Sequence, residues 1–431
     1  MRRIASALKW LYPGMKVKRW LLLIPIGVFA ILVGVAFLAN VNVLDYLDIA
    51  SVFAYRRFGI RLDQPATQKP ISIALIAFGL VLIFVAIKQV VDSITSVISP
   101  QNKGKLADVI YQKRYLSQGH SIVVIGGGTG LSTLLRGLKV YTSNIVAIVT
   151  VTDDGGSSGV LRRELGMSPP GDIRNCLVAL ADAEPLMTEL FQYRFDAGGK
   201  GLEGHSFGNL LIAAMSNITG DFEQAVKETS KVLAIRGRVL PSTATAVTLQ
   251  AEMEDGTLVE GETSIAEAPQ AIKTIHLHPS NVQPLDEAIQ AISLADVIVI
   301  GPGSVYTSII PNLLVPGIAE AIRESQAAKM YVCNVMTQRG ESDNYTASDH
   351  VKALLRHAEG RLFQYVLVNR QAPSAGLLVK YRSEGSDLVH PDVEKIRELG
   401  FRPVLGDFMS ATTVVRHDSE KLAEAVMRLA Y

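Results

Sequence analysis

Two adjacent carboxylates are the most unusual chemical feature of this sequence. Asp153 and Asp154 end the segment VTVTDD and are followed directly by GGSS, which contains Ser157 and Ser158. Like charges on neighbouring residues repel and a Gly-Ser segment loses backbone order, so a plain turn needs neither feature. Carboxylates in this setting could accept hydrogen bonds from ligand hydroxyls, hold a divalent ion such as Mg²⁺, or cap their own turn. The residues alone leave these three roles open.

A glycine-rich turn upstream of the two aspartates offers hydrogen-bond donors, whereas carboxylates accept. The segment SIVVIGGGTGLSTLL predicts a buried strand at 121–125, a turn at 126–130 and a helix from residue 131 to 141. Main-chain N–H groups in such a turn, together with a helix N-terminus, bind anions, although a tight turn that only permits close packing is the alternative. Leu131 replaces the last glycine of G-x-G-x-x-G and no G-K-[ST] follows, which argues against a nicotinamide enzyme and a P-loop. The candidate ligand-binding residues here are Gly127, Gly128, Thr129 and Gly130.

Three further segments place polar residues at the starts of expected helices. They are PPGDIRNC, GHSFGNL and GPGSVYTS, and a fourth polar loop, MTQRGE, follows a strand expected at 330–335. Helix capping is the ordinary alternative for the first two. The pattern favours anion and hydroxyl recognition, and it contains neither a G-x-S-x-G nucleophile nor a Cys/His metal cluster, so no catalytic residue is assigned. The candidate ligand-binding residues in these segments are Asp172, Arg174, Asn175, His205, Asn209, Gly301, Gly303, Ser304, Thr307 and Ser308.

These loops need a common framework, and the chain pattern supplies one. Short apolar runs ending in glycine alternate with helical stretches, which predicts an α/β fold with a Rossmann-like parallel sheet and helices on both faces. Ligands gather at the carboxyl ends of strands in such sheets. The segment 240–265 alternates in polarity about a turn at 254–257, so we expect a small inserted β-containing subdomain.

Two uncharged apolar runs near the N-terminus predict a membrane anchor. They cover residues 20–39 and 71–87, long enough for transmembrane helices at 20–39 and 71–90. Buried core helices and a cleaved signal peptide are the alternatives. The expected organisation is completed by a basic N-terminal segment at 1–19, an external loop at 40–70, a linker at 91–119 and a ligand-binding domain at 120–431.

Charge and cysteine content suggest the location of this domain. Six Lys or Arg residues precede the first run and five follow the second up to residue 119, whereas the loop between the runs has four. The positive-inside rule therefore places both ends of the hairpin in the cytoplasm of a bacterial plasma membrane. Two cysteines suggest no disulfide framework. A net charge of +1 without a clustered basic face argues against nucleic acid as a partner.

Seven segments in register resemble one bacterial family. They are VVIGGGTGLSTLLRGLK, TVTDDGGSSGVLRRELG, PPGDIRNCLVAL, HSFGNL, AEMEDGT, IGPGSVYTSIIPNLLVPGIAEAI and VCNVMTQRGE. Together they are similar to the YvcK family of gluconeogenesis factors, within the CofD-like superfamily, whose catalytic branch is 2-phospho-L-lactate transferase. The resemblance runs from about residue 121 to the C-terminal region.

The resemblance implies a Rossmann-like core that binds a UDP-sugar, typically UDP-N-acetylglucosamine, and acts in cell shape and wall synthesis during gluconeogenic growth, without a demonstrated reaction. Two departures stand out. The catalytic branch carries an acidic pair soon after an R-G-R-x-L-P-like segment, where this chain has Ser242, Thr243, Ala244 and Thr245. Typical members also begin near the glycine-rich strand and are soluble, whereas this chain carries an apolar hairpin.

The leading hypothesis is therefore a membrane-tethered, non-catalytic UDP-sugar-binding regulator with cell-wall synthesis or regulatory proteins as partners. The alternative is a phospholactate-transferase-like enzyme that moves a phosphate-bearing acceptor onto a nucleoside diphosphate, with Asp153 and Asp154 holding a divalent metal such as Mg²⁺. A scaffold without any ligand is a third hypothesis, and self-association stays open. Because the implied ligand is rich in hydroxyls, we expect the two aspartates to recognise hydroxyls with little metal dependence.

Overall fold

The computed structural model describes residues 18–39, 56, 65–98, 114–182, 185–196, 201–411 and 414–430. The chain divides into two compact units, residues 1–113 and residues 114–431. The expected basic segment at 1–19 and the expected external loop at 40–70 lie largely outside the described residues.

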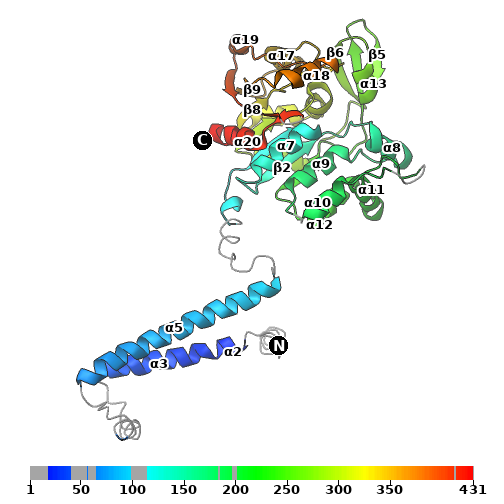
Figure 1. Ribbon diagram of the computed structural model, residues 1–431. Helices are drawn as coiled ribbons and strands as arrows, with labels where there is room; N and C mark the ends of the chain where they lie inside the picture. The colour runs from blue at the N-terminus through cyan, green and yellow to red at the C-terminus, as the bar shows by residue number, and fades with distance from the viewer. Residues whose placement is uncertain are drawn as a thin grey trace. The chain divides into compact units, whose positions relative to one another are not determined.

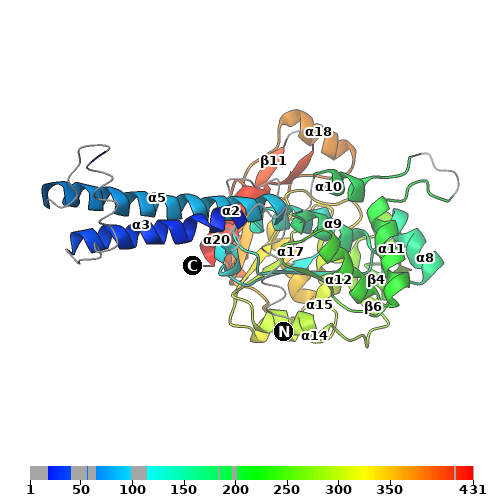
Figure 2. The ribbon, with the colours of Figure 1, turned by 90° about the horizontal axis from the view of Figure 1, so that it is seen from below.

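The first unit is a helical hairpin, visible in Figures 1 and 2. Its helices are α2 (Lys18–Leu21), α3 (Leu23–Leu38) and α5 (Pro65–Ile98). Two segments are long and apolar enough to cross a membrane, Arg19–Leu38 with 20 residues and Lys69–Ser93 with 25 residues. Helix α5 extends beyond the expected 71–90 at both ends.

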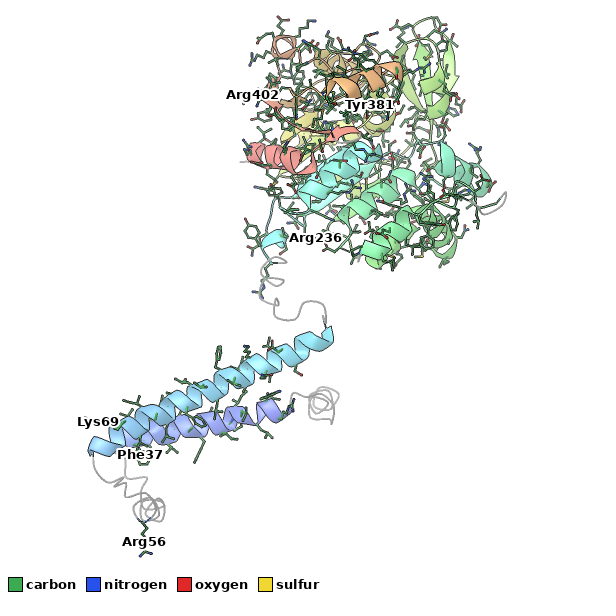
Figure 3. The ribbon with its side chains drawn as sticks, in the orientation of Figure 1. Phe37, Arg56, Lys69, Arg236, Tyr381 and Arg402 are labelled. Carbon is green, nitrogen blue, oxygen red and sulfur yellow. The ribbon has the colours of Figure 1, made fainter. Side chains whose placement is uncertain are left out.

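Glycines allow the two long helices of the hairpin to approach closely. A Cβ atom added at Gly79 would lie 2.5 Å from the carbonyl oxygen of Gly27, and one added at Gly34 would lie 2.8 Å from the side chain of Ile76. Large apolar side chains face outward instead, among them Phe84, which is 70% exposed. Phe37 and Lys69 lie at the same end of the hairpin (Figure 3). Small residues inside and apolar residues outside are typical of helix pairs in lipid.

The second unit is built on a parallel sheet, as the sequence predicts. Its seven strands run in the order β10-β9-β8-β7-β1-β2-β3, and all neighbours are parallel. Every residue of β1, β2 and β7 is buried, which is typical of strands covered on both faces. The strands are β1 (Ile122–Gly126), β2 (Ile145–Val149), β3 (Arg238–Pro241), β7 (Val297–Ile300), β8 (Ala328–Val332), β9 (Tyr365–Asn369) and β10 (Arg402–Gly406).

The chain leaves the centre of this sheet in two directions. From β1 it proceeds to β2 and β3, and from β7 it proceeds the other way to β8, β9 and β10. The boundary between β1 and β7 is therefore the topological switch point, where loops at the carboxyl ends diverge and leave room for a ligand.

Helices pack around the sheet, and Figure 1 shows α7 between α9 and α20. Helix α7 packs against α9 and α20, while α14 packs against α16, and α15 against α17. The helices are α7 (Gly128–Leu138), α8 (Gly156–Leu165), α9 (Gly171–Leu180), α10 (Pro185–Gln192), α11 (Phe207–Thr219), α12 (Phe222–Val232), α14 (Asp286–Ser293), η4 (Val305–Ile309), α15 (Ile310–Leu313), α16 (Ile318–Glu324), α17 (Ala347–His357), α18 (Ala375–Ser383), α19 (Val393–Glu398) and α20 (Ser419–Leu429).

The expected inserted subdomain is present. Strands β4 (Thr248–Met253), β5 (Leu258–Glu260) and β6 (Ile272–His278) form an antiparallel sheet, and β4 and β5 flank the expected turn. The short helix α13 (Glu262–Glu267) follows β5. A second small sheet, β11 (Met409–Ala411) with β12 (Val415–His417), precedes α20.

The helix after the glycine turn begins earlier than predicted. Helix α7 starts at Gly128 instead of residue 131, and Gly128 itself adopts a positive φ of 67°, which glycine tolerates. The turn between β1 and α7 is therefore a single residue, Gly127, and the first helical N–H groups lie directly above the strand end.

The contact between α7 and α20 gives a stability prediction. A Cβ atom added at Gly137 in α7 would lie 1.9 Å from the backbone oxygen of Ser419 in α20. We expect Gly137→Ala to lower the free energy of unfolding by about 1–3 kcal/mol through overpacking, measured by denaturant titration of the detergent-solubilised chain.

Gly376→Ala is the matched control. Gly376 lies in α18 with no atom within 4 Å of an added Cβ, so alanine should stabilise by about 0.5–1 kcal/mol through helix propensity. Equal stabilities of the two variants would show that α7 and α20 do not depend on this close approach.

Candidate functional site

A cavity of about 400 Å³ opens at the carboxyl ends of β1, β7 and β8. It lies at the switch point of the sheet, and its place at the carboxyl ends of strands is where the sequence analysis expects a ligand. Two of the predicted loops form one wall. The predicted residues that line the cavity are Gly128, Thr129, Gly130, Gly303, Ser304, Thr307 and Ser308.

The glycine turns after β1 and β7 pack directly against each other. A Cβ atom at Gly130 would lie 2.9 Å from the carbonyl oxygen of Pro302, and one at Gly127 would lie 2.5 Å from Oδ2 of Asp172. These glycines therefore serve close packing, the alternative role considered from the sequence. The same packing leaves the N-terminus of α7 facing the cavity at Gly128 and Thr129, so both roles of the turn are compatible.

The turn after β7 leads into a π-helix, a feature frequent at functional sites. Ser304 caps η4 by accepting the N–H of Thr307 at 3.3 Å, and the Thr307 hydroxyl donates to Ser304 Oγ at 2.9 Å. Glu341, from the loop after β8, accepts hydrogen bonds from the hydroxyls of Ser304 and Thr307. Gly301 supports this turn with a φ of 79° and does not line the cavity.

The two adjacent aspartates have different protein partners. Oδ1 of Asp153 accepts the N–H of Gly155 at 3.0 Å, which is the turn-capping geometry that the sequence analysis left open. Oδ1 of Asp154 accepts the N–H and the hydroxyl of Thr263 at 3.0 and 2.7 Å. Thr263 belongs to α13, so Asp154 connects the loop after β2 to the inserted subdomain.

Asp172 lies between the cavity wall and the acidic pair. Burial raises the pKa of its carboxyl to about 6, and the charge of Asp153 adds to this effect, while the N–H of Gly128 and the charge of Arg174 oppose it. A carboxyl group thus already accepts a hydrogen bond from the first residue of α7.

The remaining predicted residues form a buried polar cluster that does not line the cavity. Ser157 Oγ lies 3.0 Å from Nδ1 of His205 and accepts Nδ2 of Asn209 at 3.1 Å. Arg174 donates to Ser206 and, at 2.9 Å, to Oδ1 of Asn175. Ser158 belongs to this layer, because a Cβ atom at Gly171 would lie 2.4 Å from its hydroxyl oxygen.

Several cavity residues were not among the candidate ligand-binding residues drawn from the sequence. Two of them come from small added elements, Glu262 from α13 and Arg416 from β12, where no local motif marks them. Tyr381 comes from α18 (Figure 3). The loop after β8 was noted as polar, and its residues belong to this wall. The additional lining residues with polar side chains are Thr133, Glu262, Asn334, Thr337, Gln338, Glu341, Tyr381, Ser386, Arg416 and His417.

Charge is distributed unevenly over the cavity wall. Burial raises the pKa of Glu262 to about 9, with further contributions from Asp153, Asp172 and Glu341. Burial also lowers the pKa of His417 to about 4, so this imidazole, which lies 3.2 Å from the carbonyl oxygen of Cys333, is neutral near pH 7. Among the described residues, Arg416 forms no ion pair.

Metal-binding side chains do not converge in the described part of the chain, which contains no group of three or more His, Cys, Asp or Glu residues able to hold an ion. Cys176 and Cys333 are both buried and unpaired by disulfides.

The family model for 2-phospho-L-lactate transferase CofD matches residues 122–409. The gluconeogenesis factor of Bacillus subtilis is 51% identical over 73% of this chain and 99% of its own length. The chain belongs to the CofD family, in its gluconeogenesis-factor branch. A crystal structure of a UPF0052 family member from Bacillus halodurans is 52% identical and superposes with a TM-score of 0.70 over 72% of this chain and 99% of that chain.

Some relatives in the family also match the hairpin. A Nostoc protein, whose name marks it as a candidate gluconeogenesis factor, is 50% identical over 99% of this chain and 93% of its own length. A similarly named Deinococcus radiodurans protein is 40% identical over 100% of this chain and 91% of its own. These matches extend over the hairpin segment, whereas the Bacillus subtilis relative matches only 73% of this chain, so members of the family differ in whether they match this segment.

The raised pKa of Glu262 predicts a pH-dependent stability. Its folded-state pKa of about 9 exceeds the ordinary value of 4.5. Between these two pH values the folded protein holds a proton that the unfolded chain releases. The contribution of this carboxyl to the free energy of unfolding therefore falls as pH rises from about 4.5 to 9. We expect the Tm of Glu262→Gln to rise relative to wild type between about pH 4.5 and 9 and to level off above. Glu267→Gln, on the exposed side of α13, is the control. Parallel Tm curves for wild type and Glu262→Gln would contradict the assignment.

The contact between Asp154 and Thr263 predicts thermodynamic coupling. Asp154→Ala and Thr263→Ala should each destabilise by about 1 kcal/mol, and the double variant by clearly less than the sum, since both remove one interaction. Asp255→Ala is the control: it removes the hydrogen bond that Asp255 accepts from the N–H of Thr257 in the β4–β5 turn, and its effect on stability should add to that of Thr263→Ala. Additivity of the Asp154 and Thr263 effects would show that this contact does not hold α13.

Proposed function

We propose that this protein is a membrane-tethered regulator that binds a UDP-sugar, first of all UDP-N-acetylglucosamine, in the cavity at the switch point. Through this binding it would act on gluconeogenic growth, cell shape and cell-wall synthesis, with cell-wall synthesis or regulatory proteins as partners. The naming of its relatives as gluconeogenesis factors supports the general role.

One observation carries the ligand assignment. The cavity combines the N-terminus of α7 with an arginine, Arg416, that forms no ion pair among the described residues. Helix N-termini and arginines both bind phosphate oxygens, so a diphosphate would find two complementary partners here. The carboxyls of Glu262 and Glu341 and the hydroxyl of Thr307 suit the hydroxyls of ribose and sugar. A volume of about 400 Å³ is in the range of small-molecule sites.

The hairpin supports the membrane part of the proposal. Its two candidate spans are long enough to cross a bilayer, and its close helix contacts are made by glycines. The basic residues that flank both spans favour a cytoplasmic location for the α/β domain at the plasma membrane.

A regulator is favoured over a transferase by the residues after β3. The resemblance places an acidic pair of the catalytic branch there, whereas this chain has Ser242 and Thr243, both buried. The Thr243 hydroxyl donates to the carbonyl oxygen of Gln283 at 2.6 Å and accepts the N–H of Thr245, which is a structural role. The transferase hypothesis keeps the support of the family model, whose description is that of an enzyme.

Titration calorimetry of the full-length chain in detergent tests the proposal. UDP-N-acetylglucosamine should bind, and Arg416→Gln should weaken binding about 10- to 100-fold, the loss typical of a hydrogen bond to a charged group. Arg428→Gln is the control, because Arg428 pairs with Glu424 on α20 and does not line this cavity. EDTA should leave the affinity unchanged, because the ligand is expected to be recognised through its hydroxyls with little metal dependence.

Three results would redirect the proposal. Loss of wild-type binding in EDTA would assign a divalent ion to the site. Formation of a transferred product on incubation with a nucleoside diphosphate and a phosphate-bearing acceptor would favour the enzyme. Absence of binding to any UDP-sugar would favour the scaffold without a ligand.

A further inference from the structure

The inserted subdomain contributes one ionisable side chain to the cavity, that of Glu262. Glu262 is the first residue of α13 and lines the cavity with Glu341, and its carboxyl lies within hydrogen-bonding reach of Thr307. In the part of the chain that the structure describes, Glu262 has no cationic partner. A partly buried carboxyl without a cation is costly, so its placement needs a reason beyond folding.

Other residues hold α13 in place. Thr263 binds Asp154 through its N–H and its hydroxyl, and Ile265 is fully buried. At the other end of the helix, the backbone of Ala266 lies against Gly340, where an added Cβ would be 1.9 Å from the Ala266 carbonyl oxygen. Since these contacts fix the helix on several sides, the carboxyl of Glu262 is not needed to position it.

The surroundings of Glu262 are unsuited to phosphate. Asp153, Asp172 and Glu341 all act on its carboxyl electrostatically, so a ligand anion at this wall would meet several acids. Hydroxyl groups are suited to it, because they donate to carboxyl oxygens and accept from a protonated carboxyl. Its pKa of about 9 keeps Glu262 protonated near neutral pH and therefore able to do both.

We propose that Glu262 determines ligand specificity by recognising a hydroxyl group of the bound nucleotide sugar, either on the ribose or on the hexose. The inference rests on the proposed function, since it assigns a role within the same cavity. It gives the inserted subdomain a direct part in ligand recognition.

Calorimetry of the full-length protein near neutral pH, with UDP-N-acetylglucosamine and with UDP, tests this assignment. Glu262→Ala should weaken the binding of UDP-N-acetylglucosamine about tenfold, which corresponds to the loss of one hydrogen bond. Glu262→Gln should stay within about threefold of wild type, because an uncharged amide also donates and accepts. Glu267→Ala, on the same helix but outside the cavity, should bind as wild type does, and thermal melts should confirm that all variants fold.

The two ligands distinguish the source of the hydroxyl. If Glu262→Ala weakens the binding of both UDP and the UDP-sugar, the recognised hydroxyl belongs to the ribose. If it weakens the binding of the UDP-sugar alone, the hydroxyl belongs to the hexose. Wild-type affinity of Glu262→Ala for both ligands would overturn the inference, as would an equal loss in Glu262→Gln and Glu262→Ala. Failure of the wild type to bind UDP-N-acetylglucosamine would instead overturn the proposed function, and this inference with it.

Discussion

The close approach of two glycine turns at the centre of the sheet is the constraint on which the cavity depends. Gly127 after β1 packs against Asp172, and Gly130 packs against Pro302. Both contacts are so close that a side chain at either glycine has no space. The parallel strands β1 and β7 are neighbours, and the chain proceeds from them toward opposite edges of the sheet. Their turns therefore meet at the point where the flanking loops diverge. Any side chain that separated these turns would also move the N-terminus of α7 away from the cavity.

The site combines few charges with many neutral polar groups. One face presents helix N–H groups and Arg416, and another presents carboxyls for which burial favours the protonated form. Carboxyls that are neutral can stand beside an anionic ligand at small electrostatic cost, whereas ionised ones would repel it. Burial thus lessens the repulsion between this acidic wall and a diphosphate held at the other face of the cavity.

Local patterns in the sequence were sufficient for the sheet, the glycine turns and the inserted antiparallel strands. Each depends on residues close together in the chain, such as the apolar run before Gly127 or the turn at 254–257. The roles of Glu262 and Arg416 depend on where an insertion and a C-terminal hairpin dock, and no local spacing encodes that. The same holds for Asp154, whose partner Thr263 is distant in sequence.

The pairing of β1 with β7 also has a consequence for synthesis of the chain. Ile122 pairs with Val297, so all of β2, β3 and the inserted subdomain are made before the central strand gains its second neighbour. Until then the nascent domain carries an unpaired, wholly apolar strand edge, a state prone to intermolecular association. The ribosome therefore has to deliver more than half of this domain before the edge of its central strand is covered, so the order of synthesis leaves this apolar edge exposed for most of translation.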